Sequence, residues 1–534
     1  MHGLALLALG LGLVQGDPWP LTRAERTEYR ETSHHADVLA FLDQLQKLGA
    51  PYLVQTIGQS TGGKDIPLVI ASIPPVHTPE QARRSGKPIV YVQANIHAGE
   101  VEGKEVVLMM LRDMARKPKG SVLEKIVLVT TPIYNSDGND AFGPQNRNRG
   151  SQNGPDPIGQ RPNGQGLDLN RDCMKAESPE MRAVLANIYN RWDPDVIMDL
   201  HTTNGTRHGY PITYSPPLHP DTDPGILAYS RDELLPQVRR ELRRTGLETL
   251  DYGNLSQNPQ GASWLVFGWE GRYVTNYAGL RNRIGVLSEA LSYCPFPERV
   301  DVTRRFVDAV LAKVGRDGRR IVAMTGAADA RMIQLGTQPQ AAPPFGVRFE
   351  MADRGVEDVL VERPRPQGSP RTVEKPTDLM KVKARVFDRF KATETERFPT
   401  AYILPAEATK AVELLARHGI VVEVLTQAWQ TQAQEFLVSE VQAARSAFQG
   451  HNLKTVLGSY GPAKPTEFRS GAYLVRTAQP LGVLLFNLAE PKSLDGLAAW
   501  DFLDGMIAAD KPYPVRRTHE PVRAVSRIVP GPLG

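Results

Sequence analysis

Apolar runs alternate with amphipathic stretches along the first part of the chain. Runs dense in Val, Ile and Leu predict buried strands at 88–94, 125–133, 195–200 and 284–287. Apolar residues at helical spacing predict helices between them, at 102–116, 178–192 and 223–244. Because strands and helices take turns along the sequence, we expect an α/β fold in which helices cover a sheet.

The alternation weakens after residue 336. Two segments rich in Pro, 336–346 and 362–370, predict linkers. Beyond the first linker, a helix is expected at 406–418, and strands are expected at 399–405, 420–426 and 482–488. This interpretation divides the chain into a first domain, 17–335, and a smaller C-terminal α/β domain, 346–534. No residue pattern in the second domain indicates a role for it.

The chain opens on an apolar run, residues 3–14, which is too short to cross a bilayer as a helix. Val14 and Gly16 stand at the two positions that signal peptidase recognises, so residues 1–16 are predicted to be a signal peptide. Export to the periplasm or the medium is therefore expected, with a buried N-terminal helix as the alternative. No other run is long and apolar enough to span a membrane.

Composition narrows the classes of function. For 534 residues a formal charge of +4 is small, so it gives no electrostatic argument for nucleic acid or an anionic membrane as partner. The two cysteines, Cys173 and Cys294, are too few for a disulfide scaffold or a cysteine metal site. Two buried thiols are the favoured interpretation, and a single disulfide is the alternative if the protein is exported. The composition indicates no oligomeric state.

Three residues of metal-binding type lie next to predicted strands. His97 and Glu100 stand three positions apart, after the strand at 88–94 and before the helix at 102–116. His201 follows the strand at 195–200 directly, where an open α/β sheet places its ligands. Catalytic zinc commonly takes three such ligands and leaves one position for water. Taken singly, each residue is also compatible with a solvated side chain near a helix or loop.

A carboxylate, Glu289, lies at the end of the strand predicted from 284 onward. An acid buried at a strand end is costly unless it is paired, metal-bound or catalytic. Near an activated water it can act as general base and pass the proton to a leaving amine. An ordinary solvated acid is the alternative.

Polar residues suited to anions follow a long irregular stretch, 136–168, which is rich in Gly, Asn and Pro. Asn170 and Arg171 stand side by side just after it, and Arg161 lies near its end. An Arg fork with an Asn amide suits bidentate recognition of a carboxylate. A further Arg near a metal can stabilise a developing oxyanion. An Asn-Arg pair by itself would more often be a solvated loop.

In this order the motifs resemble the zinc carboxypeptidase A/B family, the funnelin-type metallocarboxypeptidases. The shared order is His-x-x-Glu after a strand, an Asn-x-Asp-Gly turn at 135–138, Arg, Asn-Arg, a strand-end His and a strand-end Glu. An earlier segment, 57–71, resembles the family's Gly-x-Ser strand pair. The resemblance covers roughly 17–336 and implies a mixed, mostly parallel twisted sheet with helices on both faces.

The resemblance also implies a metal centre. His97, Glu100 and His201 match the family's ligands for one zinc ion per chain, and Glu289 matches its general base. The family's mobile tyrosine, which contacts substrate, has two candidates at uncertain register, Tyr273 and Tyr277.

The anion-binding residues are carried over in the same way. Asn170 and Arg171 match the clamp on the terminal carboxylate of the substrate. Arg161 fits the oxyanion arginine best, ahead of Arg147 and Arg149.

These matches imply a zinc-dependent peptidase that removes residues from the free C-terminus of a peptide. Related zinc sites also serve N-acyl amino-acid deacylases and cell-wall peptide amidases, which are the nearest alternatives. A non-catalytic protein that binds peptide or glycan on the same fold is the alternative from another class. A comparison of peptides with free and with amidated C-termini would separate the carboxypeptidase from the deacylases and amidases.

Overall fold

The computed structural model describes residues 17–144, 152–259, 261–366, 368 and 372–530. The predicted signal peptide, 1–16, lies outside these residues, as do Arg147 and Arg149. Within the described residues, no helix combines the length and the apolar character needed to cross a membrane.

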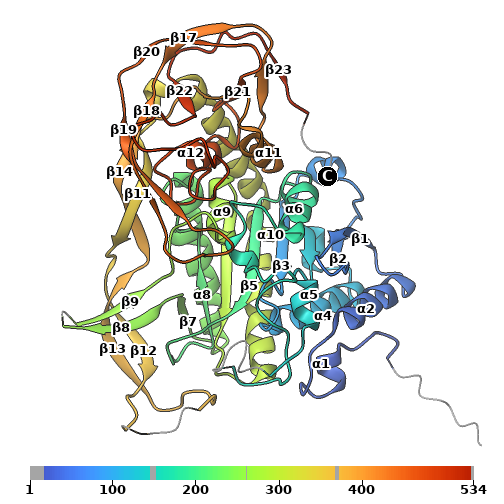
Figure 1. Ribbon diagram of the computed structural model, residues 1–534. Coiled ribbons are helices and arrows are strands. Elements are labelled where there is room, and N and C mark those ends of the chain that lie inside the picture. Colours follow the sequence, from blue (N-terminus) through green and yellow to red (C-terminus); the bar gives the residue numbers. More distant parts are fainter. Residues whose placement is uncertain (1–16, 145–151, 260, 367, 369–371, 531–534) are drawn as a thin grey trace, which may run out of the picture.

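The main sheet has eight strands in the order β1-β2-β4-β3-β5-β10-β6-β7 (Figure 1). The pairs β3–β4, β3–β5, β5–β10 and β6–β7 are parallel, and the pairs β1–β2, β2–β4 and β6–β10 are antiparallel. The predicted mixed, mostly parallel sheet is therefore confirmed. The strands are β1 (Tyr52–Gln59), β2 (Asp65–Ala71), β3 (Ile89–Ala94), β4 (Val127–Thr131), β5 (Val196–Thr202), β6 (Ile212–Ser215), β7 (Thr249–Asp251) and β10 (Ile284–Ala290).

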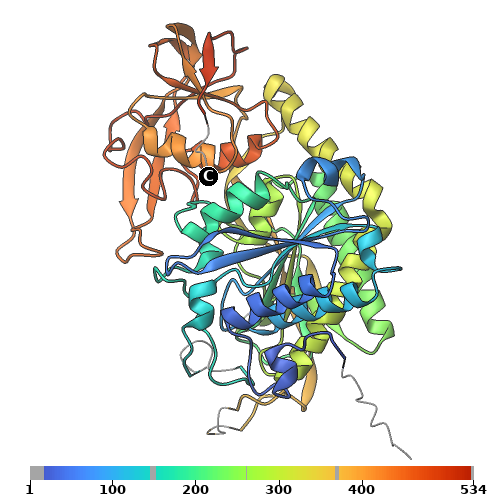
Figure 2. The same ribbon diagram turned by 90° about the vertical axis from the view of Figure 1, so that its right-hand side faces the viewer.

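Helices cover both faces of this sheet (Figure 2). Successive strand residues point to opposite faces, so Tyr91 belongs to a first hydrophobic core while Val90 and Val92 belong to a second. The second core contains residues of α2 (His35–Lys47), α4 (Glu102–Arg116), α8 (Leu235–Arg244) and α10 (Phe296–Thr337). The first core contains residues of α6 (Pro179–Val184), η4 (Leu185–Tyr189) and α9 (Val274–Leu280).

The predicted helices are found with small changes at their ends. The helix predicted at 102–116 is α4 with the same bounds. The helix predicted at 178–192 is α6 continued by the π-helical η4, and that predicted at 223–244 is α7 (Pro224–Ala228), the π-helical η5 (Tyr229–Leu234) and α8. Short helices complete this part: α1 (Arg23–Arg26), α3 (Pro79–Arg84), η1 (Val122–Glu124), α5 (Ser136–Asp140) and η3 (Leu169–Arg171).

The C-terminal part consists mainly of strands. A five-stranded sheet has the order β22-β15-β21-β16-β23, and the pairs β11–β14, β17–β20 and β18–β19 form separate two-stranded sheets. The helix predicted at 406–418 is α11 (Thr409–Arg417). The strands are β11 (Phe345–Ala352), β14 (Arg389–Glu396), β15 (Ala401–Leu404), β16 (Glu423–Leu425), β17 (Trp429–Ala433), β18 (Phe436–Ala443), β19 (Lys454–Tyr460), β20 (Lys464–Phe468), β21 (Tyr473–Arg476), β22 (Arg516–Thr518) and β23 (Ser526–Ile528).

The strand predicted at 482–488 is wrong, because this segment forms α12 (Gly482–Ala489). Every residue of α12 is buried. A run that is apolar on all sides has neither the period of a strand nor that of an amphipathic helix, so the sequence pattern could not distinguish the two. The segment packs inside the first hydrophobic core, and this packing selects the helix.

The two parts of the chain share structure across the expected linker at 336–346. One four-stranded sheet joins β12 (Gly355–Glu362) and β13 (Leu379–Phe387) to β9 (Gly261–Leu265) and β8 (Asn254–Asn258), as Figure 1 shows. The first hydrophobic core likewise contains residues of α9 together with residues of α11 and α12. The C-terminal part therefore packs as a continuation of the first part.

Both cysteines are buried and free. The preferred interpretation, two buried thiols, is therefore confirmed and the disulfide is not formed. Burial raises the pKa of Cys294 to about 12, so its thiol stays protonated at neutral pH.

Candidate metal centre

The predicted metal ligands lie at the carboxyl ends of neighbouring parallel strands. His97 and Glu100 belong to the turn that joins β3 to α4, and His201 is the sixth residue of β5. Glu289 lies on β10, directly beside His201 in the parallel register of the two strands. Because β3, β5 and β10 are adjacent, their ends bring these four side chains to one region of the sheet edge.

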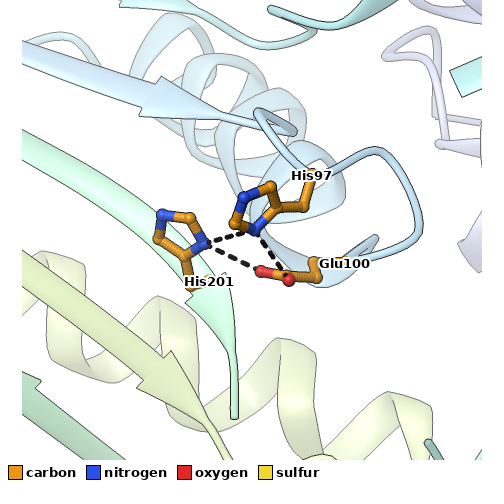
Figure 3. Close-up of side chains that lie close together, drawn as sticks. All are labelled: His97, Glu100 and His201. Atoms are coloured by element: carbon orange, nitrogen blue, oxygen red, sulfur yellow. Dashed lines mark hydrogen bonds and ion pairs between the residues drawn. The ribbon is translucent and has the colours of Figure 1, made fainter. Parts of the chain in front are cut away.

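Three ligand atoms converge on one point (Figure 3). His97 Nδ1 lies 2.9 Å from Glu100 Oε1, His201 Nδ1 lies 2.9 Å from Glu100 Oε2, and the two Nδ1 atoms are 3.1 Å apart. All three side chains are almost fully buried. Bonds of about 2.0–2.1 Å to a tetrahedral zinc would set such ligand atoms about 3.3 Å apart, so the donor set fits this ion.

The Nε2 atom of each histidine, which points away from the other two ligand atoms (Figure 3), contacts a carboxylate. His97 Nε2 lies 3.0 Å from Asp168 Oδ1, and His201 Nε2 lies 2.7 Å from Asp199 Oδ2. A carboxylate behind the ring retains the proton on Nε2 and leaves Nδ1 as the ligand atom. Asp199 stands two positions before His201 on β5, and its side chain points toward that histidine.

The pKa values of the two histidines move in opposite directions. Burial and the positive charge of Arg161 lower the pKa of His97. Burial also acts to lower the pKa of His201, but Asp199 and Glu100 outweigh it and raise that pKa well above its usual value. The carboxylates beside His201 thus favour a positive charge on that ring, whereas burial and Arg161 oppose one on His97.

Asp168 links the metal ligands to Arg161. Its Oδ1 faces His97, while its Oδ2 accepts hydrogen bonds from Arg161 Nε at 2.9 Å and lies 2.8 Å from Arg161 Nη2. Arg161 Nη1 also donates to Glu100 Oε1 at 3.4 Å. Burial acts to raise the pKa of Asp168, but His97, Arg161 and Arg171 hold it well below its usual range. The carboxylate therefore stays charged and keeps both neighbours in place.

Asn170 and Arg171 follow on the short helix η3, whose N-terminus Asp168 caps. Asn170 Oδ1 accepts a hydrogen bond from the Val274 amide at 3.0 Å, which fixes the orientation of its amide group. The guanidinium of Arg171 lies 4.5 Å from the ring centre of Tyr273. Arg171 Nη1 donates to the backbone carbonyl of Asn170 at 2.8 Å, and this hydrogen bond and the stacking on an aromatic face limit the motion of the guanidinium.

A cavity of about 110 Å³ adjoins this centre and is lined by both metal-ligand histidines, His97 and His201. Seven of its lining residues were predicted from the sequence: His97, Arg161, Asn170, Arg171, His201, Tyr273 and Glu289. Five were missed: Asn204, Tyr252, Phe267, Thr275 and Leu287. Leu287 stands two positions before Glu289 on β10 and so shares its face, a signal that strand alternation already contained.

Tyr277 does not line the cavity. It lies on α9 with its side chain fully buried, its hydroxyl lies 2.7 Å from His418 Nδ1, and Arg281 Nη1 donates to the same hydroxyl at 3.2 Å. The structure therefore places Tyr277 in a contact between α9 and the C-terminal part and not at the cavity. The sequence could not show this, because His418 is 141 positions away.

The family model described as zinc carboxypeptidase matches residues 38–252. Among curated relatives, carboxypeptidase 2 of Trichophyton equinum is 22% identical over 456 residues, covering 81% of this chain and 77% of that protein. Carboxypeptidase 2 of Trichophyton rubrum is 21% identical over 462 residues, with the same coverage.

Solved structures also match part of the chain, at lower sequence identity. A metallo-carboxypeptidase from Burkholderia cenocepacia is 16% identical, covers 53% of this chain and 69% of its own, and has a TM-score of 0.39. Carboxypeptidase A from Helicoverpa armigera is 16% identical, covers 56% and 75% respectively, and has a TM-score of 0.39.

Proposed function

Residues 38–252 belong to the zinc carboxypeptidase family, and from this membership we propose that the chain hydrolyses the last peptide bond of peptides with a free C-terminus. The observation that carries the proposal is one cavity of about 110 Å³ that is lined by the two histidines of the metal-ligand set, a carboxylate and two arginines. A hydrolase of this class needs each of these groups within reach of one peptide bond.

His97, Glu100 and His201 would hold the zinc ion. When bound, zinc supplies a Lewis acid that polarises the scissile carbonyl and lowers the pKa of water. The protein side of the reaction is done by the other residues of the cavity.

Glu289 is the proposed general base. It lines the cavity and lies beside His201 across the β5–β10 pair, so its carboxylate is close to the metal ligands without being one of them. In this role it accepts a proton from the attacking water and donates it to the amine that leaves. One carboxylate can perform both transfers because the attacking water oxygen and the leaving nitrogen are bonded to the same tetrahedral carbon.

Asn170 and Arg171 are the proposed clamp on the substrate's terminal carboxylate. Arg171 offers a planar fork of N–H donors, and its stacking on Tyr273 limits its motion. Arg161 lies against Glu100 and Asp168, so its charge is close to the metal ligands and suits the developing oxyanion. A free C-terminus is therefore the group that this cavity would recognise.

Glu289→Gln tests the assignment. The variant should lose turnover by at least about 100-fold, the lower range for removal of a general base. Its zinc content, measured by metal analysis after gel filtration, should equal that of the wild type because Glu289 is not a ligand. Glu350→Gln, an exposed exchange of the same kind on β11, is the matched control and should keep full activity.

The substrates should be paired peptides that differ only in a free or amidated C-terminus. Hydrolysis of the free form alone supports the carboxypeptidase. Equal hydrolysis of both forms would assign the chain to the amidase class, and wild-type turnover by Glu289→Gln would remove Glu289 from the mechanism.

A further inference from the structure

A loop of the C-terminal part reaches the metal centre. Residues 444–453 join β18 to β19, and we refer to them as the 444–453 loop. At its tip, Phe448 and His451 exchange backbone hydrogen bonds of 2.8 and 3.1 Å, which leaves Gln449 and Gly450 as the two residues of a tight turn.

Gln449 contacts the residue that organises the centre. Its side-chain Oε1 accepts a hydrogen bond of 2.7 Å from the backbone N–H of Asp168, across 281 positions of sequence. The carboxylate of the same Asp168 holds His97 with one oxygen and Arg161 with the other. A single amide therefore connects the C-terminal part to both a metal ligand and the proposed oxyanion arginine.

The backbone of the turn does not explain why Gln stands there. Gln449 has φ +54° and Gly450 has φ +87°. Turns with two positive φ angles favour Asn or Gly at both positions, and any other residue pays a cost of about 1 kcal/mol or more. A locally unfavourable residue that makes a contact at a functional centre indicates that the contact is what the position serves.

The turn is also held firmly in place. His451 lies between Glu177 of the first part, at 2.9 Å, and Asp501 of the C-terminal part, at 3.0 Å. The guanidinium of Arg272 lies 5.3 Å from the ring centre of Phe448. Because both neighbours of the Gln449–Gly450 pair are anchored, the Gln449 amide is presented to Asp168 in a fixed position.

We propose that the C-terminal part completes the catalytic site through Gln449, a positioning residue that fixes the backbone of Asp168 and thereby the orientation of His97 and Arg161. The proposal rests on the function proposed above and assigns a role to the C-terminal part, for which no residue pattern indicates one. Gln449 touches no substrate and acts only through Asp168.

The test compares two substitutions that suit the turn better than Gln. Gln449→Asn and Gln449→Gly both tolerate a positive φ, but the Asn side chain is one methylene shorter and Gly has none. Each variant should therefore unfold at the same or a higher temperature than the wild type. Each should also lose the contact, so that amide hydrogen exchange in the peptide containing Asp168 becomes faster.

Zinc retention gives a readout that does not depend on turnover. Loss of a group that orients a ligand typically weakens metal binding or activity 10–100-fold. Because Gln449 acts through the Asp168 backbone, we expect the lower end, about tenfold faster release of zinc to a chelator and a similar fall in kcat. Gln442→Asn, the same exchange at an exposed position of β18, is the matched control and should change none of these quantities.

The outcomes separate the two proposals. Wild-type zinc release and wild-type amide exchange in both Gln449 variants would overturn the positioning role, whatever the activity. A lower unfolding temperature with the same kcat would show that the turn serves stability alone. If the wild type itself hydrolyses no peptide, the function proposed above fails, while zinc release and amide exchange still decide whether Gln449 positions Asp168.

Discussion

The buried ion pair between Arg272 and Asp495 joins the two parts of the chain. Arg272 lies between β9 and α9, and Asp495 lies in the segment after α12. Arg272 Nε is 3.1 and 3.2 Å from the two carboxylate oxygens, and its backbone N–H donates to Oδ2 at 2.8 Å. Trp500 Nε1 donates to the other oxygen at 2.7 Å. Both charged side chains are more than nine-tenths buried.

Arg272→Met should leave Asp495 charged and buried without its counter-charge. Removing one partner of a buried ion pair costs about 3–5 kcal/mol of the free energy of unfolding. Two neutral donors, the backbone N–H of residue 272 and the Trp500 indole, would still contact the carboxylate. We therefore expect a loss at the lower end, about 3 kcal/mol.

The measurement is urea unfolding followed by tryptophan fluorescence and circular dichroism at pH 7. The double variant Arg272→Met/Asp495→Asn is the control, because it removes both charges and should be more stable than the single variant. A loss below about 1 kcal/mol, the value of an exposed ion pair, would refute the reasoning. So would a double variant that is less stable than Arg272→Met alone.

Two further predictions concern the metal centre and the 444–453 loop. Asp199→Asn should weaken zinc binding about 10–100-fold in chelator competition, because the carboxylate that holds His201 Nε2 at 2.7 Å is lost; unchanged affinity would contradict that role. Hydrogen bonding to Glu177 and Asp501 outweighs burial and raises the pKa of His451 above 6.5. The ion pairs of His451 therefore stabilise the fold fully below about pH 6.5, and this contribution is lost as pH rises through the folded-state pKa. Thermal unfolding of the wild type and His451→Gln should therefore differ most below pH 6.5 and converge at higher pH, and a difference that grows with pH would oppose the assignment.

The sequence predicted the central elements of the fold because their signals are local. The strands β3, β4, β5 and β10 are short runs of buried apolar residues, and α4 has apolar residues at helical spacing. A residue that follows such a strand must lie at the sheet edge, so the positions of His97, His201 and Glu289 could be inferred without coordinates.

Other features depended on contacts between distant segments. The run at 482–488 is apolar on every side, and only its place inside the first core makes it the helix α12. The side chain of Tyr277 turned away from the cavity because His418 and Arg281 offer its hydroxyl partners in the core. Neither outcome has a counterpart in the local sequence.

The sequence by itself determined which residues stand at the strand ends and in what order, since hydrophobic periodicity and chain order are properties of neighbouring residues. The tertiary structure alone decided how those residues are oriented: that Asp168 and Asp199 hold the two histidines from behind, and that Gln449 contacts Asp168 from 281 positions away. The physical reason is that a hydrogen bond requires a distance and a direction between two atoms. When the atoms lie far apart in sequence, the packing of the whole chain sets both.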